Sequence, residues 1–74
     1  MAKYNGHNVW YAVLRDNEDT DHGTGSFRFA DALRMARKMR KEGDTDAFIA
    51  VFDPEDDFCL AEIRDLSGAR APKL

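Results

Sequence analysis

The chain has 74 residues, of which 43% are hydrophobic and 34% are charged. This length allows one small domain, and the composition is typical of a folded globular protein rather than a disordered one. The formal net charge of −3 argues against general binding to nucleic acid. The single cysteine, Cys59, excludes a disulfide within the chain, and we find no apolar stretch long enough for a signal peptide or a membrane span. We therefore expect a cytoplasmic protein that does not bind membranes.

The first predicted element is a β-strand over residues 9–14, which are rich in β-branched and aromatic side chains. Both alternating sets of this strand are apolar, so either both of its faces are covered or one face meets a partner. Residues 16–26 are polar and contain Gly23 and Gly25, which predicts a loop. The brief alternation in residues 26–29 leaves open whether a short second strand follows.

A helix is predicted over residues 29–42, because apolar side chains recur there at intervals of three and four. Residues 47–52 form another uniformly apolar strand, and residues 58–64 follow after a short turn, which predicts an antiparallel hairpin. We place the domain in residues 1–66 and expect residues 67–74 to be a flexible tail. The predicted fold class is α+β, with a single helix packed on a three- to four-stranded, mainly antiparallel sheet in the order β-(β)-α-β-β.

Two topologies remain open. If residues 24–29 are not a strand, the helix is a crossover between parallel strands 9–15 and 47–53, and both loops after these strands leave the same edge of the sheet. We favour this arrangement. If residues 24–29 do pair with the first strand, the loops fall at opposite ends. One helix of about 20 Å is too short to cover all the large rings, so we expect an open sheet face unless the two tails fold across it.

Charge is segregated along the chain. Two acidic clusters directly follow predicted strands, and they consist of Asp16, Glu18, Asp19 and Asp21, and of Asp53, Glu55, Asp56 and Asp57. The predicted helix between them carries Arg34, Arg37, Lys38, Arg40 and Lys41. This segregation is the strongest functional signal in the sequence, since no other feature has the residue types and spacing of a catalytic centre.

The sequence does not match the common motifs for catalysis or metal binding. If a calcium-binding loop began at Asn17, it would need a glycine at the position of His22 and a bidentate glutamate at the position of Arg28. The second acidic cluster also lacks the glycine and the glutamate that a calcium loop needs. The two histidines lack zinc-ligand spacing, and Cys59 lies among apolar residues as an inert core cysteine would. The Gly23–Ser26 segment lacks the order of a phosphate-binding loop. We therefore predict no catalytic residue, no metal ligand and no cofactor.

Several short segments carry a resemblance to known proteins. They are Trp10-Tyr11-Ala12-Val13, Gly23-Thr24-Gly25-Ser26-Phe27, Ala32-Leu33-Arg34-Met35-Ala36, Ile49-Ala50-Val51 and Glu62-Ile63. Together they resemble small uncharacterised proteins of phages and conjugative elements, among which anti-CRISPR proteins are the most similar in size, acidity and lack of catalytic motifs. The resemblance assigns no role to an individual residue. It implies an inhibitor that occupies a nucleic-acid-binding surface of a host complex or locks that complex in one conformation.

We therefore expect a non-enzymatic, anti-CRISPR-like interaction module that binds a basic, nucleic-acid-handling surface of a host protein and does not bind nucleic acid directly. The expected partner-binding residues are Asp16, Glu18, Asp19, Asp21, Asp53, Glu55, Asp56, Asp57, Trp10 and Tyr11. Carboxylates would speed the encounter, and aromatic rings would supply most of the residence time. Two alternatives remain. One is a dimeric, antitoxin-like regulatory domain that pairs through the open sheet face and has a basic helix, and the other is a small ligand- or ion-binding domain.

Overall fold

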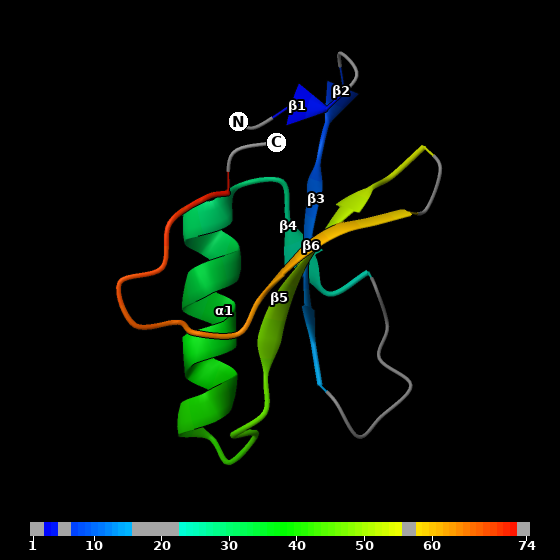
Figure 1. The fold of residues 1–74 in the computed structure, drawn as a ribbon. Coiled ribbons are helices and arrows are strands. Elements are labelled where there is room, and N and C mark those ends of the chain that lie inside the picture. Colours follow the sequence, from blue (N-terminus) through cyan, green and yellow to red (C-terminus); the bar gives the residue numbers. More distant parts are fainter. Residues whose placement is uncertain (1–2, 5–6, 16–22, 56–57, 73–74) are drawn as a thin grey trace.

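The computed structural model describes residues 3–4, 7–15, 23–55 and 58–72, and it shows one helix packed against a four-stranded antiparallel sheet (Figure 1). This confirms the predicted α+β fold class. The elements are β1 (Lys3–Tyr4), β2 (His7–Asn8), β3 (Trp10–Leu14), β4 (Gly25–Ser26), α1 (Phe29–Lys41), β5 (Phe48–Asp53) and β6 (Phe58–Ile63). The two-residue strands β1 and β2, which have no counterpart among the predicted elements, pair with each other in a separate antiparallel sheet.

The strand order in the main sheet is β4-β3-β5-β6, and every neighbouring pair is antiparallel. The favoured parallel crossover is therefore wrong. Gly25 and Ser26 do form a strand, which pairs with Ala12 and Tyr11 of β3, and α1 connects β4 to β5 on the two sides of β3. A strand of two residues, one of which is a glycine, has too little periodicity to be recognised from sequence.

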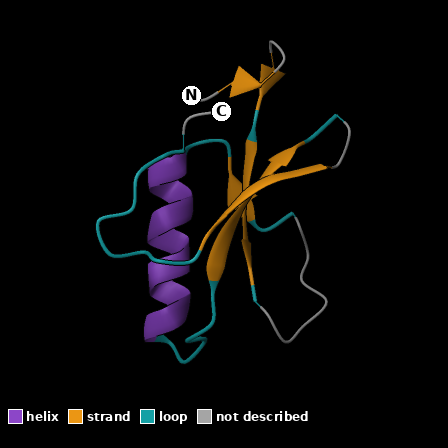
Figure 2. Ribbon diagram, viewed as in Figure 1, coloured by secondary structure: helices purple, strands orange, loops and turns teal. Residues whose placement is uncertain are grey.

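The main core lies between α1 and the sheet (Figure 2). It consists of the side chains of Val9, Tyr11, Val13, Ile49 and Val51 from the sheet, Ala32 and Ala36 from α1, and Leu66 from the C-terminal segment. Ala32 and Ala36 are fully buried, and their small side chains let the helix backbone approach the sheet closely. The helical periodicity seen in the sequence is therefore the pattern of this contact.

The opposite face of the sheet forms a second buried cluster. It consists of Ala12, Leu14, Phe48, Ala50 and Phe52, with Trp10 packed against it. None of its five members is more than 9% exposed, so the expected open face is wrong for most of the large rings. Arg64 contributes to this burial, because its guanidinium carbon lies 4.0 Å from the centre of the Phe48 ring.

The C-terminal segment after β6 crosses α1 and runs toward the N-terminal end of the helix (Figure 1). Leu66 of this segment is buried in the main core. The Nη2 atom of Arg37 donates a hydrogen bond to the Leu66 carbonyl at 2.8 Å, and Nη2 of Arg40 donates one to the Arg64 carbonyl at 2.6 Å. Two of the five helix cations therefore hold the backbone of this segment.

Candidate functional site

Six of the ten predicted partner-binding residues lie outside the described residues. They are Asp16, Glu18, Asp19 and Asp21 of the first acidic cluster and Asp56 and Asp57 of the second. The structure places the other four, Trp10, Tyr11, Asp53 and Glu55. These four occupy different environments, so they do not act as one set.

The described residues that border the two acidic clusters lie at opposite ends of the sheet. Leu14, which ends β3 before the first cluster, pairs with Phe48, whereas Trp10 at the start of β3 pairs with Phe52, next to Asp53. Leu14 and Trp10 are four residues apart on a strand, which corresponds to about 14 Å at about 3.4 Å per residue. The expectation that both loops leave one edge of the sheet is therefore wrong, because it depended on parallel strands.

Asp53 is buried rather than exposed, with only 2% of its surface accessible. Its Oδ1 atom accepts a hydrogen bond from the backbone N–H of Glu55 at 3.0 Å. An aspartate that bonds the backbone two residues further on is a common way to start a turn. Asp53 therefore shapes the turn after β5, while Pro54 and Glu55 are exposed on that turn.

Tyr11 belongs to the core and does not face a partner. It is 1% exposed, and its ring packs edge-on against Phe29, the first residue of α1, with ring centres 5.4 Å apart. Its hydroxyl is buried, and it has no hydrogen-bond partner among the residues that the structure describes. Burial raises the pKa of this hydroxyl above its ordinary value, because the protein interior disfavours the charged phenolate.

Trp10 lies on the sheet face away from the helix, where it is half-buried. The ring of Phe27, directly after β4, packs edge-on against it with ring centres 4.7 Å apart. We call Trp10 and Phe27 the aromatic pair. Edge-on packing of this kind is favourable beyond the buried area alone. Phe27 remains 42% exposed, so the pair presents apolar surface at this end of the sheet.

A third aromatic residue marks the same end of the sheet. Phe58 starts β6 opposite Asp53 and is 61% exposed. We call residues 53–58, which join β5 to β6, the hairpin tip. Phe58 is one of the large rings that the short helix was not expected to cover, and its exposure agrees with that expectation. The exposure of Phe27 was not predicted, although this residue directly adjoins a predicted turn, where side chains find few neighbours to cover them.

The basic residues of α1 have two different roles. Arg37 and Arg40 bond backbone carbonyls, whereas the side chains of Arg34 and Lys38 are 79% and 78% exposed. We define the helix patch by its exposed members Arg34, Met35, Lys38 and Lys41. These residues are spaced by three and four positions or are adjacent, so they share one side of the helix.

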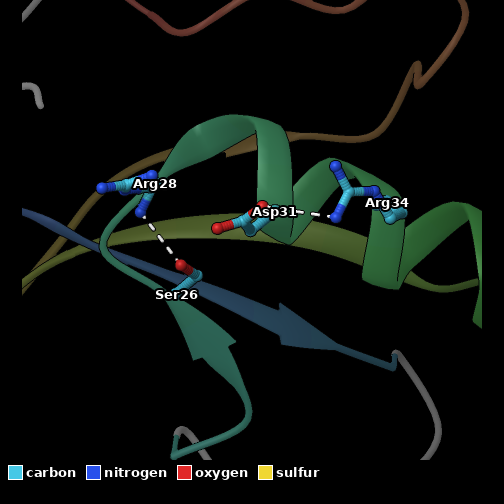
Figure 3. A network of polar contacts seen from close by, with 4 residues as sticks. All are labelled: Ser26, Arg28, Asp31 and Arg34. Atoms are coloured by element: carbon cyan, nitrogen blue, oxygen red, sulfur yellow. Dashed lines mark hydrogen bonds and ion pairs between the residues drawn. The ribbon is translucent and has the colours of Figure 1, made fainter.

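The start of α1 is held by short-range polar contacts (Figure 3). The Oγ atom of Ser26 accepts a hydrogen bond from the backbone N–H of Arg28 at 3.0 Å, and Arg34 pairs with Asp31 at 3.5 Å. Asp31 in the first turn also suits the positive end of the helix dipole. Ser26 of the glycine-rich segment therefore stabilises the turn that leads into α1.

Within the ranges that the structure describes, no group of three or more histidine, cysteine, aspartate and glutamate side chains is placed to hold a metal ion. No helix among these residues has the length and apolar character needed to cross a membrane. The comparisons with known proteins found no matching family model, no matching curated protein and no matching solved structure.

Proposed function

We propose that the protein is a non-enzymatic interaction module that binds a basic surface of a partner protein through the hairpin tip and the aromatic pair. The observation that carries this proposal is that the aromatic pair, the 61% exposed Phe58 and the exposed residue Glu55 all lie at the same end of the sheet. Aromatic side chains near charged residues are typical of the parts of interfaces that dominate binding energy.

The two kinds of side chain would act at different stages of binding. Carboxylates attract a basic surface over a distance of about one Debye length, roughly 8 Å in physiological salt, and so raise the association rate. The rings then lose contact with water in the complex and slow dissociation. By sequence, residues 53–57 contain four carboxylates and no cation, which favours a partner rich in lysine and arginine.

The proposed partner is a nucleic-acid-handling host protein, and the proposed role is inhibition, as in the anti-CRISPR proteins that the sequence resembles. Lysine and arginine side chains that hold phosphates offer the positive charge that the hairpin tip would meet. The proposed binding surface is smaller than the one expected from sequence, because the ends of β3 and β5 that precede the two acidic clusters point in opposite directions.

Charge reversal in two separate clusters tests this proposal. One variant combines Glu55→Lys, Asp56→Lys and Asp57→Lys in the hairpin tip. A matched control combines Glu18→Lys, Asp19→Lys and Asp21→Lys, which makes the same change in net charge in the first acidic cluster. Both variants are compared with the original protein as baits for affinity capture from a host lysate at low salt, with circular dichroism to confirm folding.

We expect the hairpin variant to lose its partner and the control to retain it with moderately weaker binding. Equal loss in both variants would show that only overall charge matters. Full retention by the hairpin variant would contradict the proposal. A nucleic-acid-handling protein among the captured partners is the expected identity, and surface plasmon resonance with that purified partner would measure the change in association rate.

A further inference from the structure

The C-terminal segment is joined to the rest of the protein by one buried side chain. We call residues 64–72 the strap, because they cross α1 without forming a helix or a strand (Figure 1). Leu66 is buried in the main core at 3% exposure, and the other residues of the strap are exposed or half-buried. Leu66 therefore anchors the strap much as a single catch would.

Two arginine side chains of α1 add hydrogen bonds to this anchor. Arg40 donates to the carbonyl of Arg64, where the strap begins, and Arg37 donates to the carbonyl of Leu66. Residues 65–72 form no backbone–backbone hydrogen bond with another described residue. In contrast, β6 pairs with β5 along most of its length. The strap is therefore attached far more loosely than the strand from which it continues.

The part of the strap that carries Leu66 has a turn of its own. The backbone N–H of Ser67 donates a hydrogen bond to Oδ1 of Asp65 at 3.0 Å. Both partners belong to the strap, so this bond does not depend on the contact with α1. A turn held by an aspartate in this way is locally stable. The strap can therefore leave the core and return with Leu66 already positioned.

We propose that the strap is a latch, which opens and closes as a unit while α1 and the sheet stay folded. Segments with few buried apolar contacts and few backbone hydrogen bonds open at a lower free energy than the core. On opening, Leu66 leaves the core and the guanidinium of Arg37 loses its carbonyl partner. This guanidinium then joins the cations of the helix patch. The latch therefore controls how much positive charge and apolar surface α1 presents.

Thiol labelling under native conditions distinguishes the opening of the strap from global unfolding. Two variants in a Cys59→Ser background carry one buried thiol each. One is Leu66→Cys in the strap, and the other is Ala36→Cys in α1, where Ala36 has no exposed surface. Urea denaturation of each variant gives its own unfolding equilibrium, from which the rate of labelling through global unfolding follows.

We expect the thiol at position 66 to react about tenfold or more above the rate set by global unfolding, with little change in low urea, because local opening exposes little surface. The thiol at position 36 should react at the rate set by global unfolding, and this rate should rise steeply with urea. A thiol at position 66 that also follows global unfolding would overturn the proposal.

A substitution in α1 tests whether Arg37 holds the latch. In the Leu66→Cys variant, Arg37→Met should speed labelling by about tenfold, the smaller end of the effect of a hydrogen bond from a charged group. The matched control is Lys38→Met, which removes the neighbouring charge from an exposed side chain and should leave the rate unchanged. Equal rates in these two variants would overturn the latch.

Trypsin gives a second measurement in which Leu66 is kept. Early cleavage after Arg64, followed by intact mass spectrometry, requires the start of the strap to leave α1. Arg37→Met should speed this cleavage and Lys38→Met should not. The absence of any acceleration would contradict the proposal. None of these results bears on the proposed function, since the hairpin tip and the aromatic pair contain no residue of the strap.

Discussion

Arg40 and Arg64 are joined by a hydrogen bond of 2.6 Å in which the Nη2 atom of Arg40 donates to the backbone carbonyl of Arg64. The Nε atom of the same guanidinium donates to the carbonyl of Ala47 at 2.7 Å. One side chain of α1 thus connects the helix to the start of β5 and to the end of β6. A planar guanidinium suits this role because its donors are fixed relative to each other.

We predict that Arg40→Met lowers the free energy of unfolding by about 2–3 kcal/mol, because two carbonyls lose a charged donor while most of the apolar stem is kept. Urea denaturation followed by circular dichroism measures the change. Lys41→Met is the matched control on the exposed side of the helix, and it should change the free energy by less than about 0.5 kcal/mol. Equal effects of the two substitutions would show that Arg40 does not hold the two segments.

Tyr11→Phe should not destabilise the protein at neutral pH, and we predict a gain of about 1 kcal/mol. The hydroxyl of Tyr11 is buried, and no described residue forms a hydrogen bond with it. Its removal therefore ends a desolvation cost while the ring keeps its contact with Phe29. A loss of more than about 1 kcal/mol in urea denaturation would indicate that the hydroxyl makes a favourable contact.

The same substitution should change the response of the protein to alkaline pH. Burial raises the pKa of Tyr11 in the folded state, so the folded protein binds this proton more tightly than the unfolded chain. The contribution of Tyr11 to stability is therefore complete below the unfolded value of about 10 and is lost as the pH rises through the higher folded pKa. Stability of the Phe variant should fall less steeply above about pH 10, and parallel curves for the two proteins would contradict this.

Gly25→Ala should disrupt the pairing of β4 with β3. A Cβ atom at Gly25 would lie 2.1 Å from the carbonyl oxygen of Tyr11, and φ at this glycine is +155°. Relief of this clash requires the backbones of the two strands to separate, so we predict a loss of more than about 2 kcal/mol. Gly43→Ala is the control, because Gly43 also has a positive φ, +120°, but among the described residues no atom beyond its own chain neighbours lies within 4 Å of the added Cβ.

The Gly43 control should lose only about 1 kcal/mol, the usual cost of a side chain at a positive φ. Amide hydrogen exchange can locate the effect of the Gly25 substitution. The N–H of Val13, which donates to the Thr24 carbonyl at 2.9 Å, should exchange faster in Gly25→Ala and at the original rate in Gly43→Ala. Similar losses of stability in both variants would argue against close packing at Gly25.

Phe27→Ala should expose Trp10, which is the only tryptophan of the sequence. The edge-on contact between the two rings is expected to contribute about 0.5–1.5 kcal/mol. We predict a loss of stability in this range and a shift of the tryptophan emission to longer wavelength as water reaches the indole. Met35→Ala, an exposed apolar truncation on α1, should leave the emission unchanged, and an unshifted spectrum in Phe27→Ala would contradict the aromatic pair.

Most of the secondary structure could be predicted from the sequence because its signals are local. The apolar spacing predicted a helix over residues 29–42, and the structure has α1 at Phe29–Lys41. The apolar runs predicted β3, β5 and β6 and the antiparallel hairpin of the last two strands. In each case, neighbours in the sequence set both the period of the side chains and the length of the connection.

The candidate site depended on contacts that the sequence does not encode locally. The pairing of β4 with β3 decides that β3 and β5 are antiparallel, and this direction sends the residues that precede the two acidic clusters to opposite ends of the sheet. Whether a charged side chain is free for a partner depends on groups that are distant in the sequence. Arg37 bonds a carbonyl 29 residues away, and nothing in its position on the helix distinguishes it from the exposed Lys38.

The sequence by itself determined the α+β composition of this protein, the position of its helix and the segregation of acidic from basic residues. The tertiary structure alone decided which of these charges and rings remain at the surface. The physical reason is that backbone periodicity arises from short-range geometry, whereas burial arises from the packing of whole elements. Asp53 illustrates this difference, because it belongs to an acidic cluster in the sequence but is a buried turn residue in the fold.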